Sequence, residues 1–164
     1  TFFYGPVDKI IVSNDGRLTF SAFVTSASNS GGIIAQVPLA FTASSTVSVI
    51  AGYASRSTNA IPATSVLFRA VNAVWGDTSG AIYVVDAASC VIVKSTAGIV
   101  SSVAGNRVYG TPSLNSAALT SRLPSTITAI VGDRVGNLYF SGLLGVYRIS
   151  STGILSMIAG TGRW

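Results

Sequence analysis

The side chains that could carry acid–base, metal or nucleophilic chemistry are few in this chain. Of its 164 residues five are acidic, all of them aspartates, and none is a histidine. Metal sites and general acid–base sites are usually built from His, Glu and Asp, so most of the usual set is missing. The single cysteine, Cys90, has no His to activate it as a nucleophile. We therefore expect no catalytic residue, no metal site and no cofactor.

Three of the aspartates occupy the same place in a repeated motif. Asp15, Asp77 and Asp133 are each followed by a glycine one or three residues later, and then by an apolar segment that contains an aromatic residue. Asp caps a turn with its own side chain and Gly supplies a positive φ, so the motif indicates a turn between two strands. A carboxylate cluster is the alternative. Because each aspartate belongs to a separate copy of the motif, we favour turn capping.

The motif is part of a longer repeat. An Ala-Gly pair closes each copy, at Gly52, Gly105 and Gly160, so the period is 53 to 55 residues. Each copy reads as four short strands rich in Val, Ile and Tyr; in the second copy these are residues 73–76, 81–86, 91–94 and 99–104. Only segments 62–69 and 114–123, between copies, favour a helical turn. The first copy has about 11 extra residues, which we place in the polar stretch 25–32.

The repeat resembles the NHL-type β-propeller blade. The third copy carries most of the resemblance, in Leu123-Pro124, Asp133, Gly136-Asn137-Leu138-Tyr139, Gly153-Ile154 and Ala159-Gly160. Lys94 departs from the pattern, because an apolar residue is expected there. The resemblance implies an all-β, β-propeller-like array of three four-stranded antiparallel blades within a single unit, 1–164. Blade 1 covers about residues 5–52, blade 2 about 70–105 and blade 3 about 124–160, with linkers 53–69 and 106–123.

Three blades would make an incomplete array. Propellers usually close with about four to eight blades, so two end faces would leave apolar side chains uncovered. The chain could be a segment of a longer propeller, pair into a six-bladed ring, or stack into a fibre. Since it begins at Thr1 without a signal-like segment, we expect a processed product or part of something longer. Trp164, in the last linker, is a candidate contact with a neighbouring subunit.

The composition supports association rather than membrane insertion. Hydrophobic residues make up 49% of the chain and charged residues 9%, and Ser, Thr, Gly and Asp interrupt every apolar stretch. No run approaches the roughly 18 to 20 apolar residues that span a bilayer. Hydroxyl groups supply most of the polarity, so little charge repulsion separates neighbouring copies. The same composition favours an extracellular or cell-surface setting.

Basic and aromatic residues of the linkers form a candidate binding face. In a four-stranded meander the linkers emerge on one side, together with the turns between the second and third strands. The residues placed there are Tyr53, Arg56, Arg69, Arg107, Tyr109 and Arg122. Interleaved basic and aromatic side chains can bind RNA or an anionic glycan. We favour the alternative, in which scattered arginines solubilise loops and cap carbonyl groups.

We therefore predict a non-catalytic structural protein. It would act as a scaffold that self-associates or joins further blades, as a subunit of an extracellular assembly or filament. The alternative is a binding module that recognises protein, anionic glycan or RNA through the linker face. Trp75 is expected in the core, and Cys90 is expected to be a small packing residue at the start of a strand.

Overall fold

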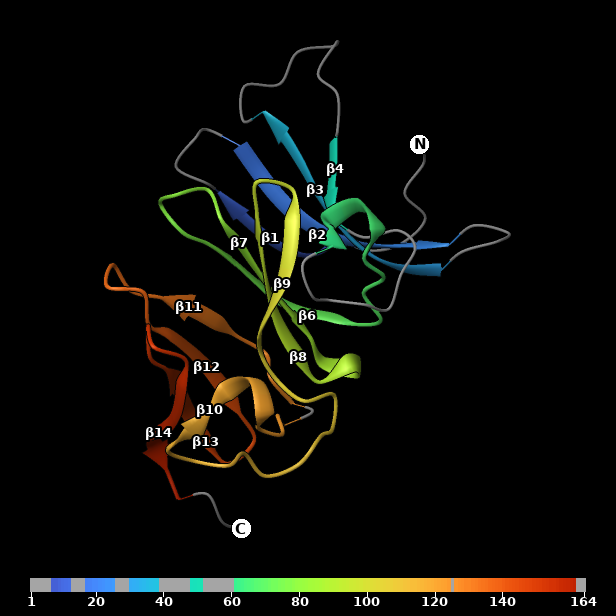
Figure 1. The fold of residues 1–164 in the computed structure, drawn as a ribbon. Coiled ribbons are helices and arrows are strands. Elements are labelled where there is room, and N and C mark those ends of the chain that lie inside the picture. Colours follow the sequence, from blue (N-terminus) through green and yellow to red (C-terminus); the bar gives the residue numbers. More distant parts are fainter. Residues whose placement is uncertain are drawn as a thin grey trace.

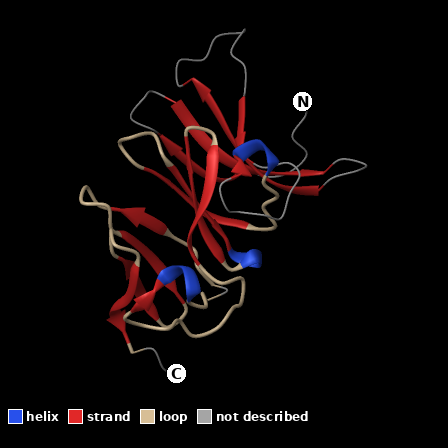
Figure 2. Cartoon of the chain, in the orientation of Figure 1, coloured by secondary structure: helices blue, strands red, loops and turns tan. Residues whose placement is uncertain are grey.

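The protein is all-β, as predicted. A computed structural model describes residues 7–12, 17–25, 30–38, 48–51, 61–124 and 126–161. Within these ranges the strands form three antiparallel sheets, and helical structure is limited to three single 3-10 turns (Figure 1, Figure 2). No helix of the described part is long and apolar enough to cross a membrane.

The second sheet contains the four predicted strands. They are β6 (Val71–Gly76), β7 (Ile82–Asp86), β8 (Val91–Thr96) and β9 (Ile99–Ala104), joined as a meander. Gly80 and Gly98 have φ values of 83° and 77° in the turns before β7 and β9, which is the conformation that favours glycine. A fifth strand, β5 (Ile61–Pro62), comes from the preceding linker and pairs with β9.

The third sheet repeats this plan. Its strands are β10 (Ser116–Ala117), β11 (Ile130–Gly132), β12 (Leu138–Gly142), β13 (Gly145–Ile149) and β14 (Ile154–Gly160). The linker strand β10 pairs with β14, as β5 does with β9. Both sheets therefore have five strands, one more than the four predicted. The added linker strand pairs with an edge whose backbone groups would otherwise be left unpaired.

The two linkers also contain the predicted helical turns. These are the 3-10 turns η1 (Ala63–Ser65) and η3 (Ala118–Thr120), which directly follow the linker strands. The third turn, η2 (Ala87–Ser89), was not predicted and connects β7 to β8.

The first sheet is a four-stranded meander with a long central hairpin. Its strands are β1 (Val7–Val12), β2 (Arg17–Thr25), β3 (Ser30–Pro38) and β4 (Ser48–Ala51). β2 and β3 have nine residues each, whereas β7 and β8 have five and six. The extra residues of the first copy therefore lengthen this hairpin around the predicted stretch 25–32, of which residues 26–29 lie outside the described ranges.

The three sheets pack face to face in chain order, with the second sheet in the middle. Ile34 of the first sheet and Val84 of the second belong to one apolar core. Val85 of the second sheet and Phe140 of the third belong to another. All five residues of β7 are buried as a result, and β6 contacts both β1 and β11. The described residues form no closed ring of sheets, so one face of the third sheet has no sheet packed on it (Figure 1).

Candidate functional site

Each sheet carries one aligned row of four side chains on the same face. We call these the forward rows, because in the first two sheets they face the next sheet along the chain. The face of a sheet that bears its forward row is the forward face, and the opposite face is the rear face. Every row takes one residue from each strand of the meander, at matching register. The first row is Ile11, Thr19, Gln36 and Ser48, the second Trp75, Tyr83, Lys94 and Ser101, and the third Val131, Tyr139, Arg148 and Ser156.

The first two forward rows lie in the contacts between sheets, apart from Ser48 of the first row, which is exposed. In the first row Gln36 Nε2 donates a hydrogen bond of 2.9 Å to Thr19 Oγ1. In the second row the ring of Trp75 lies 5.1 Å from that of Tyr83, and Lys94 Nζ lies 5.4 Å from the centre of the Tyr83 ring. This is the geometry of a cation–π contact. Lys94, the departure from the repeat pattern, is thus part of the covered row, and Trp75 packs against the core as expected.

The third forward row has the same plan but lies on the open face. Val131 is 51% exposed, and Val146, beside the row on the same face, is 38% exposed. Tyr139 Oη donates to Asp133 Oδ2 over 3.0 Å, and this bond, followed by burial, raises the pKa of the tyrosine. Arg148 Nε is buried without a hydrogen-bond partner among the described residues. An unpartnered buried donor is costly unless another group supplies an acceptor.

The repeated aspartates cap their turns, as predicted, in the two copies that the structure describes. Asp77 Oδ1 accepts hydrogen bonds from Ser79 N at 2.9 Å and from Ala81 N at 3.0 Å. Asp133 Oδ1 accepts equivalent bonds from Val135 N at 3.0 Å and Asn137 N at 2.8 Å. Asp15 lies outside the described residues.

Hydrogen bonding lowers the pKa of both carboxyl groups below the ordinary value of 3.8. For Asp77, burial is the largest influence and acts upward, but bonds from Ser79 and Ala81 together with Lys94 outweigh it. For Asp133, the side chain of Asn137 has the largest effect. Both carboxylates are therefore ionised at neutral pH and already engaged by their own turns.

A cleft of about 580 Å³ lies between these two turns. Its lining includes Trp75, Tyr83, Asp77, Asp133 and Asn137. The aspartates sit in separate copies of the repeat, as expected, yet they line one cleft because neighbouring sheets pack face to face. In the part of the chain that is described, no three His, Cys, Asp or Glu side chains lie together as a metal site would require.

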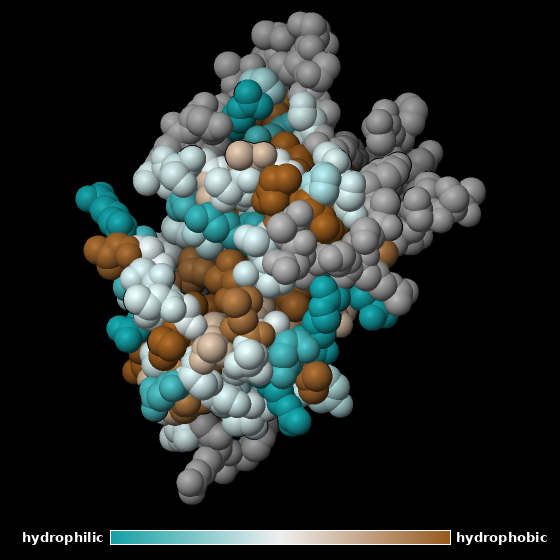
Figure 3. Space-filling model, viewed as in Figure 1, coloured by the Kyte–Doolittle hydropathy of each residue, from teal (hydrophilic) through white to brown (hydrophobic). Residues whose placement is uncertain are grey.

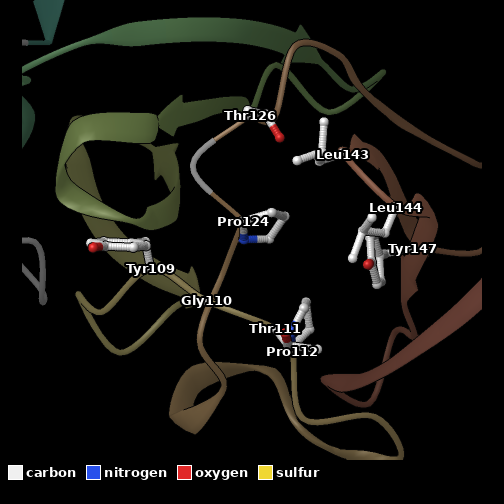
Figure 4. Close-up of a pocket in the computed structure, with 9 residues that line it drawn as sticks. All are labelled: Tyr109, Gly110, Thr111, Pro112, Pro124, Thr126, Leu143, Leu144 and Tyr147. Carbon is white, nitrogen blue, oxygen red and sulfur yellow. The ribbon is translucent and has the colours of Figure 1, made fainter. Parts of the chain in front are cut away.

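A smaller pocket of about 190 Å³ lies on the linker side of the third sheet. Pro112 comes from the linker and Pro124 directly follows it, whereas Leu143 and Leu144 come from the turn between β12 and β13, and Tyr147 from β13 (Figure 4). The linker and this turn thus lie together, on the side where the meander topology places them. Burial raises the pKa of Tyr147, whose ring stacks on Phe140 at 5.2 Å.

The predicted binding face is only partly assembled. Arg107, Tyr109 and Arg122 are all exposed and share one linker, where Tyr109 forms a bridge with Leu123. Arg69 belongs to the preceding linker, where its backbone N–H donates to Asp86 Oδ2 over 3.0 Å. Tyr53, Arg56 and Trp164 lie outside the described residues.

Asp86 is an important residue that the sequence did not single out. Its side chain is only 1% exposed and accepts hydrogen bonds from the N–H groups of Arg69, Ala70 and Ser89, at 3.0, 2.9 and 3.4 Å. It therefore fastens the linker to the end of β7. An acidic residue at the end of an otherwise apolar strand was the available signal.

Cys90 is a packing residue, as expected, although it precedes β8 instead of opening it. It is buried, has a φ of 52°, and its Sγ donates to Ala87 O over 3.5 Å. Burial, followed by the charge of Asp86, raises the pKa of the thiol. The thiol therefore stays protonated at neutral pH, which makes it a poor nucleophile.

The face of the molecule in Figure 3 is weakly polar over much of its described part. Figure 3 shows mostly pale atoms, with apolar side chains gathered where the second and third sheets meet on this side. No family model matches the chain, and no curated protein matches it. The rows, the cleft and the linker pocket of the molecule itself are therefore the basis for a function.

Proposed function

We propose that the chain is a non-catalytic structural protein, an NHL-like β-propeller segment whose three sheets serve as blades. Its function is to associate, either with further copies of itself or with further blades. Sequential meanders that pack face to face support the blade arrangement, as do first strands that contact one another: β6 touches β1 on one side and β11 on the other.

The observation that carries this proposal is the open forward row of the third sheet. The equivalent rows of the first two sheets lie beneath the next sheet. The third row has the same order of residue types as the second, namely an apolar residue (Trp75 or Val131), Tyr, a basic residue and Ser. A row that is built like a sheet contact but has no sheet packed on it is expected to be covered by another sheet.

Two details of the open face support association. Val131 and Val146 present apolar surface to water, and burying it contributes roughly 25 cal/mol per Å². The buried Nε of Arg148 has no acceptor among the described residues, and a neighbouring sheet could supply one. The hydroxyl-rich, charge-poor composition adds little repulsion between copies.

Sedimentation velocity over a range of concentrations tests this function. We expect the wild-type chain to form larger species as its concentration rises, with little dependence on salt, because the contact is mainly apolar. Val131→Asp should weaken association by roughly a hundredfold or more, since an unpaired carboxylate would be buried. Val135→Asp is the matched control: Val135 is 72% exposed, but lies in the turn and not on the forward face.

Two results would contradict the proposal. One is a wild-type chain that stays monomeric at every concentration. The other is a folded Val131→Asp variant that associates as the wild type does. Circular dichroism and a thermal melt of each variant show whether it is folded, so that a loss of association is not confused with unfolding.

An extracellular or cell-surface setting is part of the same proposal. A composition rich in hydroxyl groups and poor in charged residues supports it. Immunodetection in washed cells and in the surrounding medium is the corresponding test. Protein confined to the cell interior would argue against this setting.

The second candidate function is a binding module on the linker side. It is favoured by one observation, the exposed Arg107, Tyr109 and Arg122 on the same linker that lines the pocket in Figure 4. Affinity for heparin or for single-stranded RNA should then fall steeply with salt. The double variant Arg107→Ala/Arg122→Ala should bind more weakly and with a shallower salt dependence. No binding to either polymer at low salt would remove this candidate.

A further inference from the structure

Within the described part of the chain, one sheet face is free to receive another sheet. The forward faces of the first two sheets pack on the rear faces of the second and third. The rear face of the first sheet is covered along β3, where Ile33, Ala35 and Val37 are 2%, 0% and 4% exposed. The forward face of the third sheet remains. A face-to-face contact between the sheets of two copies therefore uses this same face on both sides.

The forward row of the third sheet is complementary to its own reverse. Across the strands it reads Val131, Tyr139, Arg148 and Ser156. When the row of a second copy is laid on it in the opposite order, Tyr139 meets Arg148 and Val131 meets Ser156. A cation then lies against an aromatic ring, as it does in the second row, where the ring centre and the ammonium group are 5.4 Å apart.

Arg148 also has a donor that a second copy can satisfy. Its Nε is buried without a hydrogen-bond partner among the described residues. Tyr139 Oη gives its proton to Asp133 Oδ2 over 3.0 Å and keeps its lone pairs as acceptors. In the reversed arrangement the Tyr139 hydroxyl of one copy is offered to Arg148 of the other. The carboxylate of Asp133, bonded to that hydroxyl, balances the charge of the incoming arginine.

The neighbouring row on the same face fits in the same way. It reads Ala129, Ser141, Val146 and Ala159 across the strands. Reversal places Val146 on Ser141 and Ala129 on Ala159. In both rows each valine thus meets a small side chain, which suits the close packing of two sheets about 10 Å apart.

We propose that two copies of this chain pair through the forward faces of their third sheets, about a two-fold axis that runs parallel to the strands between β12 and β13. Tyr139 of each copy then faces Arg148 of the other. The strands of the two sheets are aligned, which is a common way for sheets to pack. This arrangement rests on the proposed associating function and names its partner and geometry. Because the contact is isologous, association stops at two chains.

The direction of the axis follows from the charges of the row. A two-fold axis perpendicular to the strands would lay each residue of the row on its own copy, so Arg148 would meet Arg148. Like charges at close range repel. The axis parallel to the strands separates the two guanidinium groups and places each on a tyrosine instead.

Cross-linking of single cysteines tests this geometry. Chains with different tags are prepared in a Cys90→Ala background, each carrying Val131→Cys, Ser156→Cys or Val146→Cys. A short bis-maleimide linker should join Val131→Cys chains to Ser156→Cys chains, because these positions face each other. It should also join Val146→Cys chains to one another, since one strand spacing, about 5 Å, offsets them. Val131→Cys chains alone should stay mostly unlinked, because three spacings, about 14 Å, separate them along the row.

A cysteine in the adjoining turn gives the matched control. Val135 is exposed but lies outside the forward face. Linkage of Val131→Cys to Ser156→Cys should be roughly a hundredfold faster than linkage of Val135→Cys to Ser156→Cys, because a held pair has an effective concentration near millimolar. If the Cys90→Ala background does not fold, Cys90 is retained and the wild-type chain treated with the linker gives the background to subtract.

Sedimentation velocity gives an independent readout. The wild-type chain should reach a species of two chains and grow no further as its concentration rises. Arg148→Ala should weaken pairing by roughly tenfold, since the contact with the tyrosine ring is lost. Arg134→Ala is the matched control, because Arg134 is an exposed cation of the turn between β11 and β12. A folded Arg148→Ala variant that pairs as tightly as the wild type contradicts the proposal.

The remaining outcomes separate this geometry from the function on which it rests. Efficient linkage of Val131→Cys chains to one another would show the other two-fold axis, and growth beyond two chains would show a contact that does not close. Wild-type association without any of these cross-links would place the contact elsewhere on the surface. Each of these results overturns the arrangement but keeps self-association. A wild-type chain that never associates would remove the proposed function itself.

Discussion

The second and third sheets carry similar side chains in different surroundings. β7 is buried along its whole length because a sheet covers each of its faces, whereas only two of the five residues of β12 are buried. Tyr83 is 9% exposed and lies beneath the third sheet, while Tyr139, at the same register, lies on the open face. The rows are alike and the neighbours differ, which indicates that the forward row is built for contact between sheets.

The largest expected difference in stability is between alanine variants of two glycines that lie at the contacts between sheets, Gly76 and Gly132. Gly132→Ala should destabilise the fold by about 2–3 kcal/mol, because the new methyl group would overlap the rigid Trp75 ring. Gly76→Ala should cost less than about 1 kcal/mol, since its neighbour is the flexible end of Ile11, 3.2 Å away. Urea denaturation of both variants measures the difference. Equal losses of unfolding free energy in the two variants would contradict the tighter contact of Gly132 with Trp75.

A second comparison concerns how each sheet holds the segment that leads into it. Asp86→Ala should destabilise the protein by about 2–3 kcal/mol, because it removes a buried carboxylate that accepts from several partly buried N–H groups. Ser141→Ala should cost about 1 kcal/mol or less. Ser141 Oγ accepts from Ala129 N at 3.0 Å and more weakly from Thr128 N at 3.3 Å, in a more exposed place.

The same denaturation experiment ranks these two variants. Asp86→Asn is an informative intermediate, because it keeps one carbonyl oxygen as an acceptor and removes the charge. A Ser141→Ala variant that is less stable than Asp86→Ala would contradict the view that the middle sheet is the better anchored of the two.

The smallest expected effect is a difference in acid sensitivity between the two turns. Folding lowers the pKa of the Asp77 and Asp133 carboxyl groups below their ordinary value of 3.8. Each ionised carboxylate therefore stabilises the fold above pH 3.8, and this contribution is lost as the pH falls through the pKa of the folded state. We expect melting temperatures to be flat with respect to these groups near neutrality and to drop below about pH 3.8.

Melting curves between pH 7 and pH 2 are compared for the wild type, Asp77→Asn and Asp133→Asn. Each variant should start lower at neutral pH and lose less on acidification than the wild type. Asp133→Asn should show the larger change, because both carboxylate oxygens of Asp133 accept hydrogen bonds, including those from Asn137 and Tyr139. A wild-type protein whose melting temperature is unchanged by acid would refute this role.

Local signals in the sequence predicted the strands and turns well. Alternating Val, Ile and Tyr gave the meanders, and the Asp and Gly of each turn predicted a cap that Asp77 and Asp133 form with their own backbone. The linker strands β5 and β10 were missed, because two residues carry no periodicity and their pairing depends on an edge presented by a later segment.

The repeat pattern could not predict the contacts between sheets. Lys94 stands where the repeat pattern expects an apolar residue. The structure explains it, because Lys94 lies beside the ring of Tyr83 in the row beneath the third sheet. The role of Asp86 likewise depends on N–H groups some 16 residues earlier in the chain. The exposure of Val131 and Val12 depends on which sheets are neighbours, which no local pattern contains.

The central claim is that the open face of the third sheet is a sheet-contact surface without its partner. Electron microscopy of the purified 164-residue chain tests it most directly. We predict particles of more than one chain in the wild-type protein and their loss in Val131→Asp, with Val135→Asp unchanged. Fields that hold nothing larger than single chains, at concentrations well above those used for sedimentation, would contradict the claim.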